Sequence, residues 1–433
     1  MAMATKLQWL PRLLLLTHST FFLVCHTTAL PWTLHHASGL PPVVLLPGST
    51  CSQIEARLTD AYEPPSPLCA AHKGDGQWHR LWKNATATDA DAPCFADQFR
   101  LIYDDAGGDY RNAPGVQTRA VFFGSTRGFL ADDPADMELC MGKLVEALER
   151  AGYHDGETLF GAPYDFRYAP APSGTANREV SRFRRRLREL VERASRTNGD
   201  KPIILVSHSQ GGYFALDFLN RSPLPWRRRF VKHFVMASTG AGGFVQLMQI
   251  LPSSGSSASA SPADVRMIFP GIFSALPSPV AFGDDTPLAI TANRSYAASD
   301  MPAFLVAVGL TPQTVWLYET RALPVALSLG PPLVPMTCIN GVGVPTMEKL
   351  VYPDAGLDGA PEVVYGDGDG VVNLASILTL DKVMGGDPRQ EYYRSIRIAN
   401  MSHRGVVSDA LALDQLLRVI LEATSPAVDT HAI

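Results

Sequence analysis

Short apolar stretches alternate with amphipathic ones along most of the chain. Residues 43–46 and 203–206 are continuous apolar runs and 230–236 is mostly apolar, which predicts three buried strands. Residues 144–150 and 180–193 instead repeat apolar side chains at helical spacing. Strands that alternate with helices favour a mostly parallel sheet with helices on both faces, so the pattern predicts an α/β fold.

The pattern changes after residue 250. Residues 252–262 read PSSGSSASASP, a low-complexity linker that cannot pack a core. Loops and short helical pieces with many prolines continue from there to about residue 340. A strand signal returns at 362–365, and a final helix is predicted at about 406–424. We interpret residues 252–340 as an insertion into a single domain.

The first residues have the pattern of a secretory signal peptide, which we assign to 1–29. Lys6 and Arg12 supply a positive start, a broken apolar core follows, and small residues stand at 27–29. The prediction is a mature domain of residues 30–433 in the secretory pathway, extracellular or in a vacuolar or lysosomal lumen. No later stretch is apolar over enough residues to cross a bilayer.

The composition is that of a globular protein. The chain has 433 residues, of which 46% are hydrophobic and 18% charged, enough to bury a large core. The net charge of −5 gives no reason to expect nucleic acid as a partner. The sequence leaves the oligomeric state open. Sequons make Asn84, Asn293 and Asn400 candidates for glycosylation, while Pro223 disfavours the sequon at Asn220.

Cysteine usage agrees with an oxidising compartment. Once Cys25 in the predicted signal peptide is set aside, five cysteines remain, so at least one thiol is free. Cys69 and Cys94 flank a polar loop and are the natural candidates for a disulfide. The pairing of three others is left open: Cys51, Cys140 and Cys338.

A serine follows the strand predicted at 203–206. Residues 207–212 read SHSQGG and lead at once into a helix-like segment at 213–219. A strand, an abrupt turn and a helix, with small residues two before and two after Ser209, are the context of a nucleophile elbow. Ser207 stands where glycine is usual, and it is small enough to be tolerated. The alternative interpretation is a plain Gly/Ser-rich loop after a buried strand.

A serine nucleophile needs a histidine as base and a carboxylate to orient it. In α/β-hydrolases these groups follow in the order serine, acid, histidine. The histidines after Ser209 are His233, His403 and His431. His233 lies too early, in a predicted strand, and His431 lies in a C-terminal tail without pattern. His403, in a loop before the last helix, is therefore the predicted base.

The acid is expected after a late strand and upstream of His403. The glycine-rich run at 363–373 offers Asp367 and Asp369, which chemistry alone does not separate. A calcium loop is the alternative, but it fails because position 371 is valine and no glutamate closes the loop. No metal site is predicted. For the oxyanion hole we expect two backbone N–H groups, those of Gln210 and Ser49.

Five segments resemble the family of lecithin–cholesterol acyltransferases and lysosomal phospholipases A2, and in particular its plant acyltransferase-like members. These segments are PGSTCSQIEARL (47–58), GAPYDFRYAP (161–170), VSHSQGG (206–212), INGVGVPT (339–346) and YGDGDGVVNLAS (365–376). The similarity extends over about residues 40–420.

The resemblance implies a mechanism and a fold. It assigns Ser209 as nucleophile, Asp369 as acid and His403 as base, with Ser49 and Gln210 as oxyanion donors. It implies an α/β-hydrolase with a cap at 252–340 and a small disulfide-closed membrane-docking loop within 60–100. The implied activity needs no calcium or other cofactor. It cleaves an acyl ester of a glycerophospholipid through a serine acyl-enzyme, and the acyl group passes to water or a lipid alcohol.

The chain departs from this family in several places. The loop between Cys69 and Cys94 holds Trp78, Leu81 and Trp82 but continues with polar residues, so we expect weak membrane docking. Cys338 stands at the family position for a second disulfide, but the expected partner position, 380, is leucine. Residues 239–243 and 120–123 also differ from the family pattern, which affects the expected pocket walls.

Three functions are compatible with these features. The leading hypothesis is a lipid acyl hydrolase or acyltransferase with a lipid ester substrate and transient contact with a membrane surface. The alternatives are a carboxylesterase acting on esters other than phospholipids and a non-catalytic lipid-binding protein on the same scaffold. The second alternative is disfavoured because such proteins usually lose a triad residue, and none is lost here.

Overall fold

The computed structural model describes residues 40–84, 91–130, 134–251, 269–357 and 359–424. The predicted signal peptide, the linker at 252–262 and His431 lie outside these ranges. No helix within them is long and apolar enough to cross a membrane.

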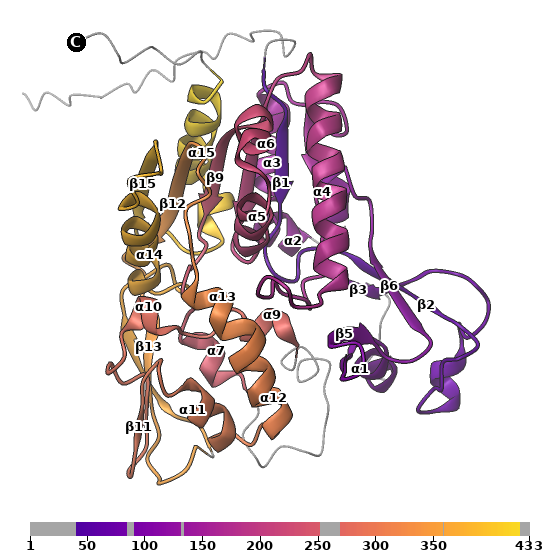
Figure 1. Ribbon diagram of the computed structural model, residues 1–433, viewed down its shortest axis with the longest axis vertical. Helices are drawn as coiled ribbons and strands as arrows, with labels where there is room; N and C mark the ends of the chain where they lie inside the picture. The colour runs from indigo at the N-terminus through magenta and orange to yellow at the C-terminus, as the bar shows by residue number, and fades with distance from the viewer. Residues whose placement is uncertain (1–39, 85–90, 131–133, 252–268, 358, 425–433) are drawn as a thin grey trace, which may run out of the picture. The chain divides into compact units, whose positions relative to one another are not determined.

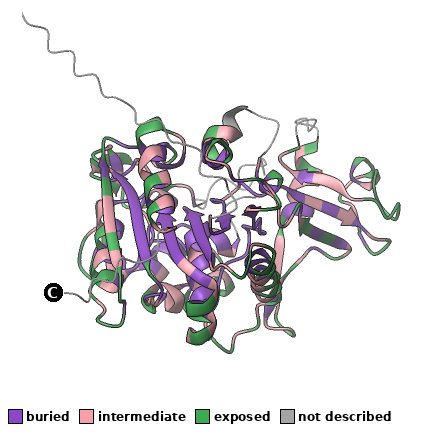
Figure 2. Cartoon of the chain, turned by 90° about the horizontal axis from the view of Figure 1, so that it is seen from above, coloured by how far each residue is buried: buried purple, intermediate pink, exposed green. Residues whose placement is uncertain are grey.

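A six-stranded sheet forms the centre of the described domain, with the strand order β15-β12-β9-β8-β1-β7 (Figure 1). All its pairings are parallel. Its strands are Val43–Leu46 (β1), Leu159–Gly161 (β7), Ile203–His208 (β8), Val231–Ala237 (β9), Met336–Val342 (β12) and Tyr393–Ala399 (β15). Figure 2 shows the centre of this sheet buried. A parallel sheet covered on both faces needs apolar side chains on both, which explains the unbroken apolar runs of β1 and β8.

Helices cover both faces of this sheet. Val44 and Leu46 of β1 pack into one apolar cluster with α4 and α5, whereas Val43 and Leu45 pack into another with α3 and α15. This alternation follows from the two-residue period of a strand. The helices are Gly142–Arg150 (α3), Arg178–Thr197 (α4), Gly211–Asn220 (α5) and Ala410–Glu422 (α15). The predicted α/β-hydrolase fold class is confirmed.

The last helix begins later than the sequence predicts. Its apolar periodicity starts at Val406, but residues 405–407 form a single 3₁₀ turn and α15 begins at Ala410. The side chain of Asp409 accepts a hydrogen bond from the N–H of Leu411 and caps the helix. A capping aspartate therefore sets the start of this helix, because it satisfies a free N–H that apolar periodicity ignores.

A second, smaller sheet has the strand order β11-β10-β13-β14. The strand expected at 362–365 is β14, and it pairs antiparallel with β13 in this sheet, not in the central one. Short helices pack with the sheet around an apolar cluster of its own. These elements are α9 (Pro270–Phe273), α10 (Pro279–Phe282), β10 (Ala289–Ile290), β11 (Ser295–Tyr296), α11 (Met301–Ala307), α12 (Pro312–Leu317), α13 (Leu323–Leu327), β13 (Thr346–Val351) and β14 (Glu362–Gly366).

The segment after β1 forms a three-stranded antiparallel sheet of order β3-β2-β6. A disulfide joins Cys69 to Cys94, as the sequence suggests. The elements here are β2 (Ile54–Leu58), η2 (Pro67–Ala70), β3 (His79–Trp82), α1 (Ala92–Phe99), β4 (Leu101–Asp104), β5 (Asp109–Asn112) and β6 (Val116–Ala120). Other short elements are η4 (Thr126–Gly128), α2 (Pro134–Leu139), α6 (Leu224–Phe230), α7 (Gln246–Gln249), η5 (Tyr318–Ala322), α14 (Leu374–Leu380), η6 (Asp381–Gly385) and η7 (Gly405–Val407).

Candidate active site

Ser209 lies on the sharp turn between β8 and α5. Its φ of 52° is in the left-handed region, which a residue other than glycine adopts at a cost. The two glycines that follow allow the turn. A Cβ on Gly211 would lie 2.5 Å from the carbonyl oxygen of Pro47, and one on Gly212 would lie 2.2 Å from Oγ1 of Thr239. The turn thus has the geometry of a nucleophile elbow.

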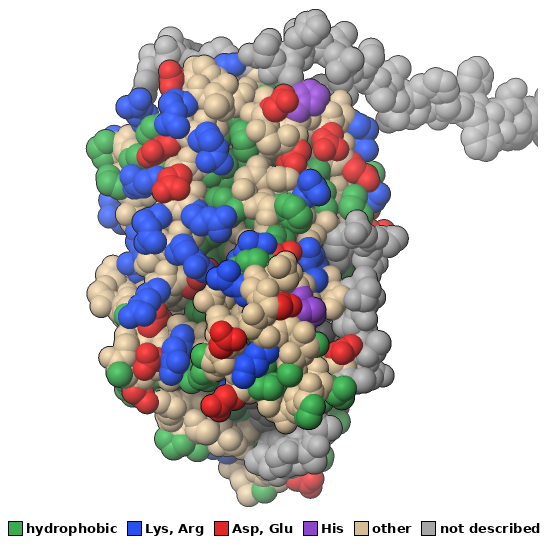
Figure 3. Space-filling model, turned by 90° about the vertical axis from the view of Figure 1, so that its right-hand side faces the viewer, with side chains coloured by type: hydrophobic (Ala, Val, Ile, Leu, Met, Phe, Trp, Pro, Cys, Tyr) green, Lys and Arg blue, Asp and Glu red, His purple; other side chains and the backbone are tan. Residues whose placement is uncertain are grey.

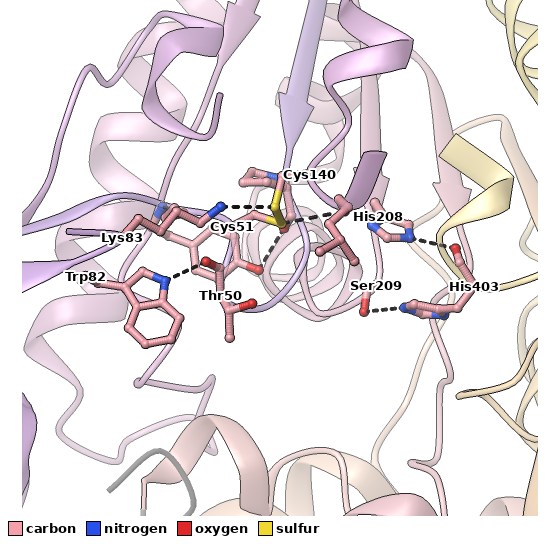
Figure 4. The surroundings of a disulfide bond; sticks show 12 residues. Thr50, Cys51, Trp82, Lys83, Cys140, His208, Ser209 and His403 are labelled. Carbon is pink, nitrogen blue, oxygen red and sulfur yellow. Dashed lines mark hydrogen bonds between the residues drawn. A yellow bond between two sulfur atoms is a disulfide. The ribbon is translucent and has the colours of Figure 1, made fainter. Parts of the chain in front are cut away.

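Ser209, His403 and Asp369 form a hydrogen-bonded chain. The Oγ of Ser209 lies 3.0 Å from Nε2 of His403, and Figure 4 marks this hydrogen bond with a dashed line. On the other side of the ring, Nδ1 of His403 lies 2.9 Å from Oδ2 of Asp369. The carboxylate accepts the Nδ1 proton, which leaves Nε2 free to accept the serine proton. The structure therefore brings together three side chains that are 34 and 194 residues apart along the chain.

The main chain around Asp369 orients its carboxylate. Oδ1 accepts hydrogen bonds from the N–H groups of Val371 (3.0 Å) and Val372 (2.7 Å). The N–H of His403 donates to the carbonyl oxygen of Asp369 at 2.7 Å and ties the two loops together. Asp367 instead is exposed and accepts from the N–H of Gly343 at 2.6 Å. The geometry thus separates the two aspartates that sequence chemistry left equal.

The surroundings of Asp369 keep it ionised. Burial alone would raise the pKa of this carboxyl, which is 1% exposed. The adjacent His403 and the amides of Val372 and Val371 act in the opposite direction, and the net effect is a pKa below its ordinary value. A carboxylate that stays charged can stabilise an imidazolium beside it.

The expected oxyanion donors lie beside the serine. Ser49 and Gln210 line one cavity together with Ser209 and His403. Among the described residues, the backbone N–H groups of Ser49 and Gln210 have no acceptor. The loop carrying Ser49 packs closely on the elbow, since a Cβ on Gly48 would lie 3.3 Å from Cβ of Ser209. Two unpaired amides next to a serine can receive a negatively charged oxygen.

The cavity at Ser209 has a volume of about 270 Å³. Much of its wall is apolar, which suits a hydrocarbon chain or another apolar ester group. The apolar wall comes from α2, α5 and the region of α7 and α9. The residues are Leu139, Tyr213, Phe244, Leu247, Ile272 and Ala275.

His208, the residue before the serine, is buried against the histidine loop. Its Nε2 lies 3.1 Å from the carbonyl oxygen of His403, and because a carbonyl oxygen only accepts, Nε2 carries the proton. Burial, together with the neighbouring His403, lowers the pKa of His208 to about 3, so the ring is neutral near pH 7. A Cβ on Gly48 would lie 3.1 Å from Nδ1 of His208. His208 thus contacts both the Ser49 loop and the His403 loop, a role not deduced from its place in the motif.

The other sequence candidates lie away from this cavity. His233 is in β9, with Nε2 2.9 Å from Oγ1 of Thr337, and burial lowers its pKa to about 4. Cys338 is a buried free thiol in β12. The three sequon asparagines are exposed: Asn84, Asn293 and Asn400.

A second disulfide borders the cavity. It joins Cys51 to Cys140, 89 residues apart, and both cysteines line the cavity wall. The sequence left these cysteines unassigned, because Cys140 lies in no motif and spacing alone does not fix disulfide pairing. The position of Cys51, two residues after Ser49, is the one available hint.

The fold, the elbow and the hydrogen-bonded Ser–His–Asp chain define an α/β-hydrolase. A family model described as lecithin:cholesterol acyltransferase matches residues 77–267. Lecithin-cholesterol acyltransferase-like 1 of Oryza sativa subsp. japonica is 43% identical over 401 residues, which cover 91% of this chain and 89% of that protein. The protein of the same name in Arabidopsis thaliana is 40% identical over 404 residues (88% and 90%). Lysosomal phospholipase A and acyltransferase of Homo sapiens is 29% identical over 390 residues (88% and 90%). The chain belongs to the lecithin:cholesterol acyltransferase family.

Proposed function

We propose that this protein is a serine acyl hydrolase or acyltransferase that cleaves an acyl ester of a glycerophospholipid. The observation that carries the proposal is the continuous hydrogen bonding from Ser209 through His403 to Asp369. Family membership and the names of the relatives, which include acyltransferases and phospholipases, support the substrate class. The acyl group passes from the serine to water or to a lipid alcohol.

The mechanism follows from the positions of the atoms. His403 Nε2 takes the proton of Ser209 as the serine Oγ attacks the ester carbonyl. Asp369 stabilises the resulting imidazolium, and the amides of Ser49 and Gln210 stabilise the oxyanion of the tetrahedral intermediate. The imidazolium then protonates the departing lipid alcohol, which leaves an acyl-enzyme. Water or a second alcohol, deprotonated by His403, attacks this ester and regenerates the serine.

Probe labelling tests the nucleophile. A fluorophosphonate is expected to modify Ser209 irreversibly in the wild-type protein and to leave Ser209→Ala unlabelled, with loss of esterase activity. Mass spectrometry of the labelled peptide identifies the modified residue. Modification of a different serine, or full activity in Ser209→Ala, would refute the assignment and return the non-catalytic lipid-binding alternative.

Product analysis tests the substrate. The protein is incubated with mixed phospholipid vesicles, with and without an added sterol, and lipids are analysed by mass spectrometry. We expect a lysophospholipid together with either free fatty acid or an acylated alcohol. The position of the remaining acyl chain and the identity of the acylated product then define donor position and acceptor. Vesicles left unchanged by a protein that labels with the probe would exclude phospholipids.

A carboxylesterase acting on other esters is the second candidate, and the segment between Cys69 and Cys94 favours it. The ring of Trp82 packs against Phe95 and Phe99 rather than facing outward, and Leu81 is buried. Apolar insertion into a bilayer scales with the apolar area available, at about 25 cal/mol per Å². Comparing rates on a soluble short-chain ester and on vesicles distinguishes the two candidates.

Membrane contact therefore relies on charge as well as on apolar insertion. Figure 3 shows many Lys and Arg side chains on the face where α4 and the sheet of β2, β3 and β6 lie. Within the described part of 60–100, Leu68 is the large apolar side chain with the greatest exposure, at 76%. We propose a transient contact in which this basic face approaches anionic headgroups. Binding should be stronger to anionic than to neutral vesicles and should weaken as salt is added; equal, salt-independent binding to both would contradict the proposal.

The proposed compartment is the lumen of the secretory pathway or the cell exterior. Two disulfides support it, because they persist in oxidising compartments. Fusing residues 1–29 to a fluorescent reporter tests the predicted signal peptide. A reporter that stays in the cytosol would contradict it.

A further inference from the structure

The disulfide between Cys51 and Cys140 lies directly beside the proposed oxyanion loop, which we define as residues 47–53. Cys51 is two residues after Ser49, and Cys140 lies between α2 and α3. Both cysteines are buried, and both line the cavity that holds Ser209 (Figure 4). The bond therefore joins the loop that carries Ser49 to the segment between α2 and α3, which lines the same cavity.

The oxyanion loop makes few contacts that hold it from within. The loop has no regular secondary structure, and among described residues the one backbone hydrogen bond between two residues of the loop runs from Cys51 N–H to Gly48 oxygen at 3.4 Å. At Thr50 the backbone has a left-handed φ of 64°. A loop with one long internal bond and a strained residue depends on outside contacts for its shape.

Those outside contacts come from both ends of the loop. The hydroxyl of Tyr164 donates to the oxygen of Pro47 at 2.9 Å, and the N–H of Tyr164 donates to Oγ of Ser52 at 3.0 Å. Nearest to Ser49, the indole Nε1 of Trp82 donates to the oxygen of Thr50 at 2.6 Å. Figure 4 shows the hydrogen bond from Trp82 to Thr50 and, next to Thr50 in the chain, Cys51 with its disulfide to Cys140.

The two contacts nearest Ser49 also connect with each other. Lys83 follows Trp82 in the chain, and its Nζ lies 3.3 Å from Sγ of Cys140. Trp82, Lys83 and the disulfide thus surround Thr50 and Cys51. The side chain of Ser49 takes no part in this arrangement, so the direction of its amide is set by its neighbours.

We propose that the Cys51–Cys140 disulfide, with Trp82, positions the Ser49 amide for the transition state. Breaking this disulfide therefore lowers kcat more than it weakens substrate binding. This inference rests on the proposed function. Its physical basis is that an oxyanion forms only during the reaction. An amide that has moved fails to stabilise the transition state but costs little in the binding of the uncharged ester.

The expected effect is large. Removing one oxyanion donor costs about 10²–10³ in kcat, and a misplacement of about 1 Å costs roughly 10². Because the loop keeps its Tyr164 and Trp82 contacts, we expect the double variant Cys51→Ala/Cys140→Ala to lose about tenfold to hundredfold in kcat, with KM changed by less than about threefold.

The experiment uses the full mature protein and a soluble short-chain ester. Active sites are counted with a fluorophosphonate, so that kcat refers to folded protein. The control is Cys338→Ala, which removes a buried thiol that does not line the cavity and should keep kcat within about twofold of wild type. A trifluoromethyl ketone, which forms a tetrahedral adduct with the serine, should bind the double variant more weakly by the same factor as kcat/KM. Unchanged kcat per site, or a change confined to KM, would overturn the proposal.

Two further measurements decide the matter if the double variant does not fold. A small dithiol can reduce the wild-type protein: its two thiols become a disulfide, and the Cys51–Cys140 bond takes up two electrons and two protons to give two thiols. Activity should fall as thiols appear at these two positions and should return on reoxidation.

The Trp82→Phe variant keeps an aromatic ring but loses the N–H donor, and about fivefold lower kcat is expected. Full activity after reduction and in Trp82→Phe would contradict the proposal.

The outcomes separate this inference from the function on which it rests. If wild-type protein has no esterase activity that Ser209→Ala abolishes, the proposed function fails. If wild type is active, Ser209→Ala is inactive and the double variant equals wild type per active site, the function stands and this inference alone is wrong.

Discussion

The two sides of the cavity around Ser209 are held in different ways. On the acid–base side, Asp369 and His403 lie on separate loops that hydrogen bonds between side chains and main chain connect. On the oxyanion side, a covalent bond at Cys51 and a tryptophan hydrogen bond hold an otherwise irregular loop. The difference fits the chemistry we propose. Side chains that exchange a proton orient one another through their hydrogen bond. The direction of a backbone amide depends instead on the conformation of its loop, which neighbouring residues must hold.

The largest expected effect breaks the acid–base side. Asp369→Asn keeps the shape of the side chain but favours the wrong tautomer of His403, and kcat on a soluble ester should fall by about 10⁴. Asp367→Asn is the matched control, two residues away and outside the hydrogen-bonded chain. It should remain within about threefold of wild type. Equal losses in the two variants, with folding verified by circular dichroism, would show that Asp369 has no special role.

His208 sharpens the comparison because it contacts both sides. His208→Phe keeps a ring but removes the Nε2–H that donates to the carbonyl oxygen of His403. The carbonyl oxygen of His403 loses this donor and the His403 loop is free to shift, so we expect about tenfold lower kcat in a folded protein. Steady-state kinetics on a soluble ester, normalised to titrated active sites, measures the change. Activity equal to wild type would mean that the contacts of Asp369 position His403 without help from His208.

Low pH affects both activity and stability, and a variant of His233 separates the two. The folded pKa values of His233 (about 4) and His208 (about 3) lie below the unfolded value of about 6.5. Between these values the unfolded chain binds protons that the folded protein does not, so stability falls as pH decreases from about 6.5. Each group contributes up to about 1.4 kcal/mol per pH unit.

His233→Gln removes one of these protons far from the cavity. The decline in the free energy of unfolding from pH 6.5 to pH 4.5, measured with urea, should become shallower than in wild type. The acid limb of the kcat profile should stay the same, because the proposed base is His403, which must be neutral to accept the serine proton. An acid limb that moves with His233→Gln would mean that unfolding, not protonation of the base, limits activity at low pH.

The comparison also explains how far the sequence could predict the site. The chain order serine, acid, histidine selects His403 by elimination, because this order can be read directly from the sequence. The choice between Asp367 and Asp369 depends on which side chain the turn points at His403, and sequence chemistry does not contain that direction. The disulfide on the oxyanion side joins cysteines 89 residues apart, so no local sequence pattern predicts it.

Tertiary packing also determines two features that local signals in the sequence leave open. The strand signal at 362–365 is correct, but the strand pairs with β13 in the small sheet, because strand propensity does not determine which edge a strand joins. The loop after Cys69 was expected to dock weakly on membranes, and within it Trp82 packs against Phe99 and donates a hydrogen bond to Thr50. In both cases the residue type is evident from the sequence and its partner is not.

The smallest expected effect concerns Ser207, at the end of the strand that carries Ser209 between the two sides. Ser207 is fully buried, and its hydroxyl has no hydrogen-bond partner among the described residues. A buried hydroxyl without a partner costs free energy, so Ser207→Ala should raise the free energy of unfolding by up to about 1 kcal/mol, measured with urea. Because the elbow needs only a small residue here, kcat should stay within about twofold. A marked loss of activity would instead mean that this hydroxyl forms a hydrogen bond during the reaction. Ser207 would then help to position the acid–base side or the oxyanion side of the cavity.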